Sequence, residues 1–518
     1  MFLHTPTPEQ AAILSAAQTT QASILIEADA GAAKSTTLEM IAQTLPPQPF
    51  LALAFNVKIK KALEARLPSH AKVMTLNGLG HSAWLRTIRG KTVTLDDKKL
   101  GRILTAVAKS MSITITDDLW LNIRDTVSGA MMSGLIPASY PQKGLIPDTN
   151  ESWSSIWPVG PIPEDLIPLC RAILEASIDE GFRGTISYDD QIYLPTMFGG
   201  VFPRYDLVLV DEGQDLSQLN ILQIKKTGPK RLIVAGDRKQ SIYAFRGADS
   251  AAMDRIKGLS KDWIELPLHQ TFRCPRAVVA RQQRHAPGYT AAESCSDGEI
   301  LSWLPPPNCS EEEHSKPTWD LEMLRPYFSS GIFILCRNNG PLMSIAMKMI
   351  RARIGPTMLG RDIGKGLIAL SKKILPSDDT DPAQCRRQIA TYYEAEALKL
   401  RLAEQDSKIS GLEDRTESLL AVLDFSTSAG DLRRNITEIF ANENSKIVLG
   451  SIHRAKGLES PCVLHLDPWR IPSRYAKGAA HRGDMSQLRQ EENLQYVCET
   501  RTSHTLILAN LKNLDSQS

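Results

Sequence analysis

The chain has 518 residues, and its length and composition limit the classes of protein to which it can belong. A single hydrophobic core rarely grows past roughly 250–300 residues, so at least two domains are expected. Hydrophobic residues make up 42% and charged residues 23%, the balance of an ordinary soluble protein. The net charge of +2 is too close to zero to indicate nucleic-acid binding by itself, so any surface for a polyanion must be local.

The cysteines and the first residues exclude further classes. The eight cysteines form no C-x-x-C pair and have no accompanying histidine cluster, which argues against a zinc site or an iron–sulfur cluster and is typical of a reducing compartment. Residues 1–10 lack the charged-then-apolar pattern of a signal peptide, and no apolar run approaches the ~18 residues of a membrane span. A cytoplasmic protein without a membrane partner is therefore expected.

Short apolar runs recur along the chain and are predicted to be strands. They lie at residues 23–27, 50–54, 207–210, 232–235, 331–335 and 446–449. Strands this apolar are typical of parallel sheets that are covered on both faces. Helix-rich blocks interrupt the series at about 92–192 and 365–442, so the simplest architecture is two α/β cores, each with a helical insertion. Short basic runs are predicted to be solvated helix faces: Lys58, Lys60 and Lys61; Arg86, Arg89 and Lys91; Lys98, Lys99 and Arg102.

The first predicted strand leads into a loop that suits phosphate groups. Residues 24–37 read ILIEADAGAAKSTT, so small residues precede a helix that begins with Lys34 and Ser35. Small residues let backbone N–H groups close on phosphate oxygens, and the helix N-terminus adds positive potential. Lys34 would reach the β- and γ-phosphates of ATP, and the Ser35 hydroxyl would bind Mg²⁺. The predicted nucleotide-binding loop comprises Ala30, Gly31, Ala32, Ala33, Lys34, Ser35 and Thr36.

This loop departs from the G-x-x-x-x-G-K-[ST] pattern, because Ala28 and Ala33 stand where the pattern has glycine. If Ala33 has a positive φ, its methyl group costs roughly 1–2 kcal/mol. An impaired ATP site is therefore an open alternative.

A second acidic motif follows the strand at 207–210. Residues 206–215 read DLVLVDEGQD, which delivers Asp211 and Glu212 to the carboxyl end of a buried strand, where open α/β sheets bind ligands. Asp211 can hold Mg²⁺ together with Ser35. Glu212 can orient and deprotonate an attacking water.

The order of these motifs resembles the UvrD/Rep group of superfamily-one helicases over nearly the whole chain. TPEQ at 7–10 looks like the group's glutamine motif, in which Gln10 would read the adenine edge. The match is strongest at 235–248 (AGDRKQSIYAFRGA), where the resemblance implies that Gln240 senses the γ-phosphate. It also implies that Tyr243 and Phe245 stack on DNA bases, at roughly 1–3 kcal/mol per base, and that Arg246 links the two sites. Further DNA contacts are implied for Phe55, Asn56, Thr75 and His453.

The resemblance assigns the second core a share of the ATP chemistry. Phe272 would stack on adenine, and Arg273 and Arg501 would contact the γ-phosphate, Arg501 as an arginine finger. Gly457 and Glu459 would meet phosphate and ribose. The implied fold is two RecA-like P-loop cores, at 1–90 with 193–268 and at 269–364 with 443–518. The helical insertions would be 91–192 and 365–442.

The function implied is ATP-dependent, 3′-to-5′ movement on single-stranded DNA that unwinds a duplex, with ATP and Mg²⁺ as cofactors. Single-stranded DNA and duplex junctions are the expected partners, and protein loading partners are left open. Two alternatives remain. One is a translocase that strips proteins from DNA without efficient unwinding. The other is a DNA-binding regulator whose ATP site is impaired by Ala28 and Ala33.

Overall fold

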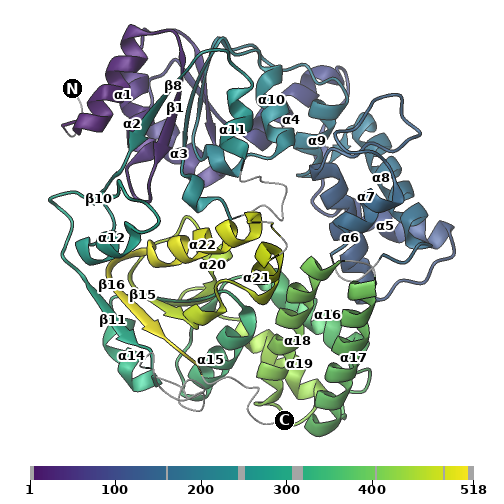
Figure 1. The fold of residues 1–518 in the computed structure, drawn as a ribbon. Coiled ribbons are helices and arrows are strands. Elements are labelled where there is room, and N and C mark those ends of the chain that lie inside the picture. The colour runs from purple at the N-terminus through teal and green to yellow at the C-terminus, as the bar shows by residue number, and fades with distance from the viewer. Residues whose placement is uncertain are drawn as a thin grey trace. The chain divides into compact units, whose positions relative to one another are not determined.

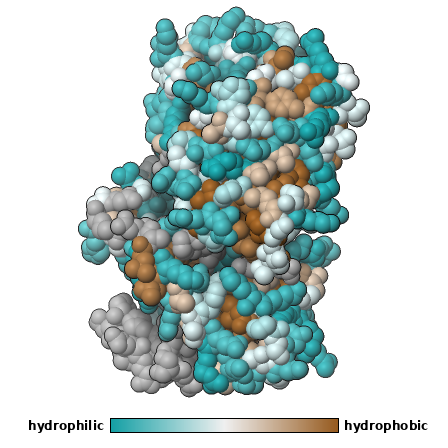
Figure 2. All heavy atoms as spheres, turned by 90° about the vertical axis from the view of Figure 1, so that its right-hand side faces the viewer, coloured by the Kyte–Doolittle hydropathy of each residue, from teal (hydrophilic) through white to brown (hydrophobic). Residues whose placement is uncertain are grey.

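The structure is a computed structural model, which describes residues 5–158, 162–242, 251–305, 319–402, 405–481, 483 and 485–511. The chain divides into two compact units, of which the first ends at Gln270 and the second begins at Thr271 (Figure 1). Figure 2 shows hydrophilic side chains over most of one face, with hydrophobic side chains gathered in small patches. Among the described residues, no helix has the length and apolar character that crossing a membrane requires.

A sheet of six parallel strands forms the centre of the first unit, in the order β3-β2-β6-β7-β1-β8. Its residues alternate between two hydrophobic clusters, because neighbouring side chains of a strand point to opposite faces. Ile24 and Ile26 pack with α1 and α2, whereas Leu25 packs on the side of α4, α10 and α11. The strands are β1 (Ser23–Ala28), β2 (Phe50–Ala54), β3 (Ala71–Thr75), β6 (Leu207–Val210), β7 (Arg231–Gly236) and β8 (Trp263–Leu268).

The helices of the first unit cover this sheet and form a separate helical block. Those around the sheet are α1 (Pro8–Thr19), α2 (Lys34–Thr44), α3 (Val57–Arg66), α4 (Leu76–Thr87), α10 (Gln218–Lys226) and α11 (Ala252–Lys257). The block has its own apolar core around the buried Trp84 and Trp153. It contains β4 (Thr94–Leu95), α5 (Lys99–Ser110), α6 (Asp117–Met132), α7 (Asn150–Ile156), α8 (Leu166–Arg183), β5 (Thr185–Ile186) and α9 (Asp190–Met197).

One basic residue of this block contradicts its prediction. Lys99 was expected on a solvated helix face, but its side chain is fully buried. Its Nζ donates to Asp190 Oδ2 at 2.6 Å and to the Ser177 carbonyl at 2.7 Å. The prediction was wrong because a carboxylate distant in the sequence compensates the charge, and spacing along one helix cannot show such a partner.

The second unit has another sheet of six parallel strands, in the order β11-β16-β15-β12-β14-β13. They are β11 (Glu299–Trp303), β12 (Ile332–Cys336), β13 (Thr357–Met358), β14 (Ile447–Ser451), β15 (Ser460–Leu466) and β16 (Thr502–Ala509). All the predicted strands occur, each within a residue or two of its expected bounds, so the α/β class with parallel sheets is confirmed. Two short strands, β9 (Gln270–Thr271) and β10 (Thr290–Ala291), pair separately.

The helices of the second unit share one apolar core with its sheet. This core joins strand residues such as Ile334 and Leu464 to helical residues such as Leu419 and Ile436. In Figure 1, α16 to α19 form a bundle beside the sheet. The helices are α12 (Arg276–Gln282), α14 (Leu321–Phe328), α15 (Asn339–Arg351), α16 (Arg361–Ile374), α17 (Pro382–Leu402), α18 (Ile409–Leu423), α19 (Ala429–Ile439), α20 (Ile452–Ala455), α21 (Arg474–His481) and α22 (Ser486–Glu499).

Candidate nucleotide site

The phosphate loop runs from the end of β1 to the start of α2. Gly31 has a φ of 71°, and Ala33 adopts φ 58° and ψ 38°, the left-handed region that alanine enters at a cost of roughly 1–2 kcal/mol. Ala33 is also the N-cap of α2 and offers no side-chain acceptor to the first N–H groups of that helix. A helix start of this kind is suited to bind an anion. Ala30 and Ala32 are buried within the loop, and Thr36 lies half-buried on the first turn of α2.

The lysine and serine that begin α2 meet the two carboxylates that follow β6. Ser35 Oγ donates to Asp211 Oδ2 at 2.6 Å, and Lys34 Nζ lies 3.8 Å from Glu212 Oε1. Burial raises the pKa of Asp211 to about 6, with a further contribution from the neighbouring Glu212 charge. Glu212 has a φ of 56°, so this site contains two non-glycine residues in the left-handed region. Residues with strained backbone angles cluster at functional sites, where the surrounding structure holds them in place.

A chain of hydrogen bonds connects Glu212 to Gln240. Glu212 Oε2 accepts from Gln214 Nε2 at 2.6 Å, and Gln214 Oε1 accepts from the Asp237 N–H at 3.0 Å. Asp237 Oδ2 then accepts from Gln240 Nε2 at 2.7 Å. Burial raises the pKa of Asp237 to about 6, although Lys34 opposes the rise. Gln214 and Asp237 both lie in recognised motifs, yet the sequence analysis gave neither a role.

Gln10 also lies against the phosphate-loop helix. Its Oε1 accepts from the Thr7 N–H at 3.0 Å in a capping box at the start of α1, which orients the amide. Its Nε2 donates to Thr37 Oγ1 at 3.0 Å. The predicted adenine-reading residue is therefore held one turn along α2 from Lys34.

A charged cluster beneath the loop was missed by the sequence analysis. Asp29 is fully buried, and its carboxylate lies 2.9 Å from Lys239 Nζ and 2.7 Å from His269 Nδ1. The His269 N–H donates to Glu9 Oε2 at 2.8 Å. The cluster therefore joins the phosphate loop to α1, to the segment after β7 and to the end of β8. The sequence offered one indication of this cluster, because Asp29 is an acidic residue within a loop of small residues.

The predicted DNA contacts of the first unit follow β2 and β3, which pair at Ala54 and Thr75. Phe55 is 47% exposed, which is unusual for a phenylalanine and suits stacking. Asn56 and Thr75 act as helix N-caps, accepting from the N–H groups of Ile59 and Gly78. Capping alone therefore accounts for these two residues. The predicted contacts Tyr243, Phe245 and Arg246 lie outside the described residues.

The second unit brings together most of the residues predicted there. Arg273 Nε donates to Glu459 Oε2 at 2.6 Å, and Phe272 beside it is 47% exposed. Arg501 is 1% exposed and donates from Nε to the Val497 carbonyl at 3.0 Å and from Nη1 to the Leu458 carbonyl at 3.5 Å. Gly457 has a φ of 80° and is exposed, and His453 lies half-buried on α20.

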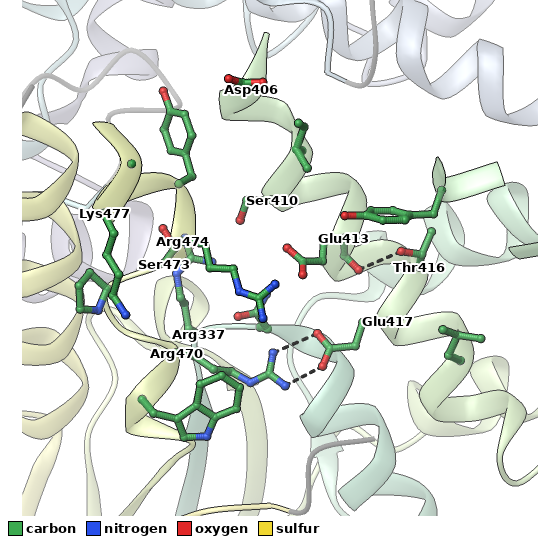
Figure 3. A pocket seen from close by; sticks show the side chains of 18 of the residues that line it. Arg337, Asp406, Ser410, Glu413, Thr416, Glu417, Arg470, Ser473, Arg474 and Lys477 are labelled. Carbon is green, nitrogen blue, oxygen red and sulfur yellow. Dashed lines mark hydrogen bonds and ion pairs between the residues drawn. The ribbon is translucent and has the colours of Figure 1, made fainter. Parts of the chain in front are cut away.

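The second unit also contains a cavity of about 1180 Å³ between the α17–α18 region and the segment 469–478 (Figure 3). Its lining is rich in charge, but three of its arginines, Arg337, Arg386 and Arg470, are paired with acids. Arg337 Nη2 lies 2.6 Å from Glu491 Oε1, and Arg470 forms two hydrogen bonds with Glu417, at 2.6 and 3.1 Å. These bonds stabilise the walls of the cavity.

Comparison with known proteins finds similarity to helicases. The family model of the UvrD/REP helicase N-terminal domain matches residues 196–260, the segment that carries Asp211, Glu212 and Gln240. F-box DNA helicase protein 1 of Schizosaccharomyces pombe is 22% identical over 93% of this chain and 55% of its own length. A probable DNA helicase II homolog of Rickettsia felis is 24% identical over 54% of this chain and 44% of its own length.

A shorter match is closer in sequence. The RecBCD enzyme subunit RecB of Mycolicibacterium smegmatis is 32% identical over 21% of this chain and 11% of its own length. The chain spans about half the length of the first two relatives. The family match and these relatives show that the chain is similar to UvrD/Rep helicases.

Proposed function

We propose that this protein is a helicase that hydrolyses ATP and moves on single-stranded DNA. The proposal is carried by two contacts at one site. Lys34 Nζ lies 3.8 Å from Glu212 Oε1, and Ser35 Oγ lies 2.6 Å from Asp211 Oδ2. A cation at a helix N-terminus binds phosphate, and a carboxylate beside it can activate water. The helicase relatives support the same function.

In this proposal Lys34 binds the β- and γ-phosphate oxygens of ATP, and Gln10 orients the adenine. Glu212 holds a water molecule and accepts its proton as the oxygen attacks the γ-phosphorus. The bond from that phosphorus to the β–γ bridging oxygen breaks, leaving ADP and phosphate. Gln240 senses this change through the hydrogen bonds that join it to Glu212.

A Mg²⁺ ion fits the residues at this site, because Ser35 Oγ and Asp211 Oδ2 are adjacent oxygen donors of the kind that the ion takes together with phosphates. When bound, Mg²⁺ neutralises charge on the β- and γ-phosphate oxygens. Asp211 and Ser35 would hold it.

The proposal gives Arg273 and Arg501 the role of stabilising charge on the transferred phosphoryl group, a contribution that can reach ~10³–10⁵ in rate in related chemistry. It also assigns stacking on DNA bases to the exposed Phe55 and to Tyr243 and Phe245. Movement in the 3′-to-5′ direction and duplex unwinding are the finer parts of the proposal.

Two assays test it. Phosphate release is measured with and without single-stranded DNA, and strand displacement is measured on 3′-tailed and 5′-tailed duplexes. The proposal expects DNA-stimulated hydrolysis and unwinding of the 3′-tailed duplex. Hydrolysis without unwinding of either substrate would instead indicate a translocase that clears proteins from DNA. DNA binding without hydrolysis would favour the regulator, which the left-handed Ala33 at the phosphate loop would explain.

A further inference from the structure

Glu499 is a buried carboxylate at the end of α22, two residues before Arg501. It accepts hydrogen bonds from Arg281 Nε at 2.7 Å and Nη2 at 3.1 Å, from Gln495 Nε2 at 3.0 Å, and from Gln282 Nε2. His465 Nδ1 lies 3.5 Å from its Oε1. Burying a charged carboxylate is costly, and the surrounding donors offset that cost. A buried charge with so many partners is therefore suited to hold several elements in fixed positions.

The side chains around Glu499 come from three different elements. Arg281 and Gln282 belong to α12, His465 to β15, and Gln495 to α22 itself. Burial alone would raise the pKa of Glu499, but the nearby His465 and the hydrogen-bonded Arg281 hold the pKa well below its usual range. Glu499 therefore stays charged, and its charge ties the three elements together.

Two of these elements, α12 and α22, adjoin the two arginines assigned to the γ-phosphate. Arg273 stands three residues before α12, and the neighbouring Cys274 Sγ donates to the Thr500 carbonyl at 3.5 Å. Arg501 follows α22 directly and donates from Nη1 to the Leu458 carbonyl at 3.5 Å. Leu458 adjoins Glu459, the partner of Arg273.

We propose that Glu499 is a positioning residue, whose carboxylate fixes the end of α22 against α12 and β15 and so fixes Arg501 relative to Arg273. The inference rests on the proposed ATP hydrolysis. Its structural basis is the set of contacts by which Glu499 joins three elements distant in sequence.

The test is a double-mutant cycle in the full chain with Glu499→Gln and Arg501→Ala. The amide introduced by Glu499→Gln would turn donors toward Gln282 or Gln495 and leave Arg281 without its counter-charge. Since about 1 Å of misplacement can lower a rate ~10²-fold, we expect Glu499→Gln to lower kcat for DNA-stimulated hydrolysis by about 10- to 100-fold, with the KM for ATP unchanged. The double variant should be no slower than Arg501→Ala alone, because both remove the same contribution.

Glu491→Gln is the matched control. Glu491 lies on the same helix and is also buried, and it forms a two-point ion pair with Arg337 rather than with α12. It should lower thermal stability while leaving kcat near the wild-type value. If Glu499→Gln does not fold, Arg281→Gln, whose side chain is 27% exposed, should reproduce the loss of kcat.

Three outcomes overturn the inference alone: a wild-type kcat in Glu499→Gln or Arg281→Gln, an equal loss of kcat in Glu491→Gln, or additive losses in the double variant. A wild-type protein that hydrolyses no ATP, or an Arg501→Ala variant with unchanged kcat, overturns the proposed function and the inference with it.

Discussion

Lys34 Nζ lies 3.8 Å from Glu212 Oε1, so the cation expected to bind phosphate and the carboxylate expected to activate water face each other across one site. They are 178 positions apart in the chain and meet because β1 and β6 end at the same edge of a parallel sheet. Asp211, next to Glu212 in the chain, accepts a hydrogen bond from Ser35 Oγ, next to Lys34.

Removal of either group should stop catalysis. Glu212→Gln keeps an oxygen that can accept from Gln214 but cannot take a proton, so hydrolysis should fall by ~10²–10⁴-fold. Lys34→Ala should lower it to background. Steady-state phosphate release with single-stranded DNA measures both. Lys230→Ala, which removes an exposed ion pair with Asp206, is the control and should hydrolyse ATP normally. Normal turnover in Lys34→Ala or Glu212→Gln would contradict the assignment.

The left-handed backbone at Ala33 predicts that glycine at this position stabilises the protein. Glycine at this position removes a left-handed penalty of roughly 1–2 kcal/mol. It also adds about 0.4–1 kcal/mol of unfolded-state entropy. Ala33→Gly should therefore stabilise the protein by up to about 1.6 kcal/mol, as measured by urea unfolding. Ala32, which is buried and is not among the described residues with positive φ, is the control, since Ala32→Gly should destabilise. A destabilised Ala33→Gly would show that the methyl group has favourable contacts that outweigh the strain.

Asp211 makes the reaction sensitive to acid. Its pKa is raised to about 6 by burial and by Glu212, so the carboxylate becomes protonated as the pH falls through 6. A protonated Asp211 cannot hold a cation, and kcat/KM, which reports groups of the free enzyme, should fall below about pH 6. The measurement is a profile of kcat/KM for ATP between pH 5 and 8 at saturating DNA. A flat profile over this range would count against the role of Asp211.

The raised pKa of Asp211 affects folding stability in the opposite direction, since a lower pH favours the folded protein. Because the folded-state pKa of Asp211 lies above its usual value of 3.8, ionisation costs more in the folded protein than in the unfolded chain. The stability that this group contributes is complete below pH 3.8 and is lost as the pH rises through about 6. Asp211→Asn should thus flatten the pH dependence of the unfolding free energy between these values.

The buried pair of Lys99 and Asp190 should matter for stability. Lys99→Met leaves Asp190 buried without its counter-charge, which typically costs about 3–5 kcal/mol, so the midpoint of urea unfolding should fall strongly. The neighbouring Lys98 is exposed, and Lys98→Met should change the unfolding free energy by less than about 0.5 kcal/mol. Equal effects of the two substitutions would show that the buried ion pair contributes nothing specific.

Local patterns were enough to predict much of the fold. Each run of apolar residues that the sequence analysis assigned to a strand lies in a buried parallel strand, because such runs are stable only where both faces of a sheet are covered. The half-exposed edge strand β3 (Ala71–Thr75) was missed, since its burial is incomplete and its residues show no such run. The strands β8, β11, β13, β15 and β16 were also missed. The loop of small residues between β1 and α2 was also predictable, because small residues followed by lysine and serine are contiguous in the chain.

The amino-acid sequence by itself determined six of the strands, the loop that precedes α2 and the position of the acidic pair after β6, since each depends on residues within a few positions of one another. Only the tertiary structure decided which charges meet. Asp29 pairs with His269, which is 240 positions away, and Glu499 pairs with Arg281, 218 positions away. Burial of an ionisable group is compensated by partners that the fold brings in from distant segments, and local spacing carries no information about them.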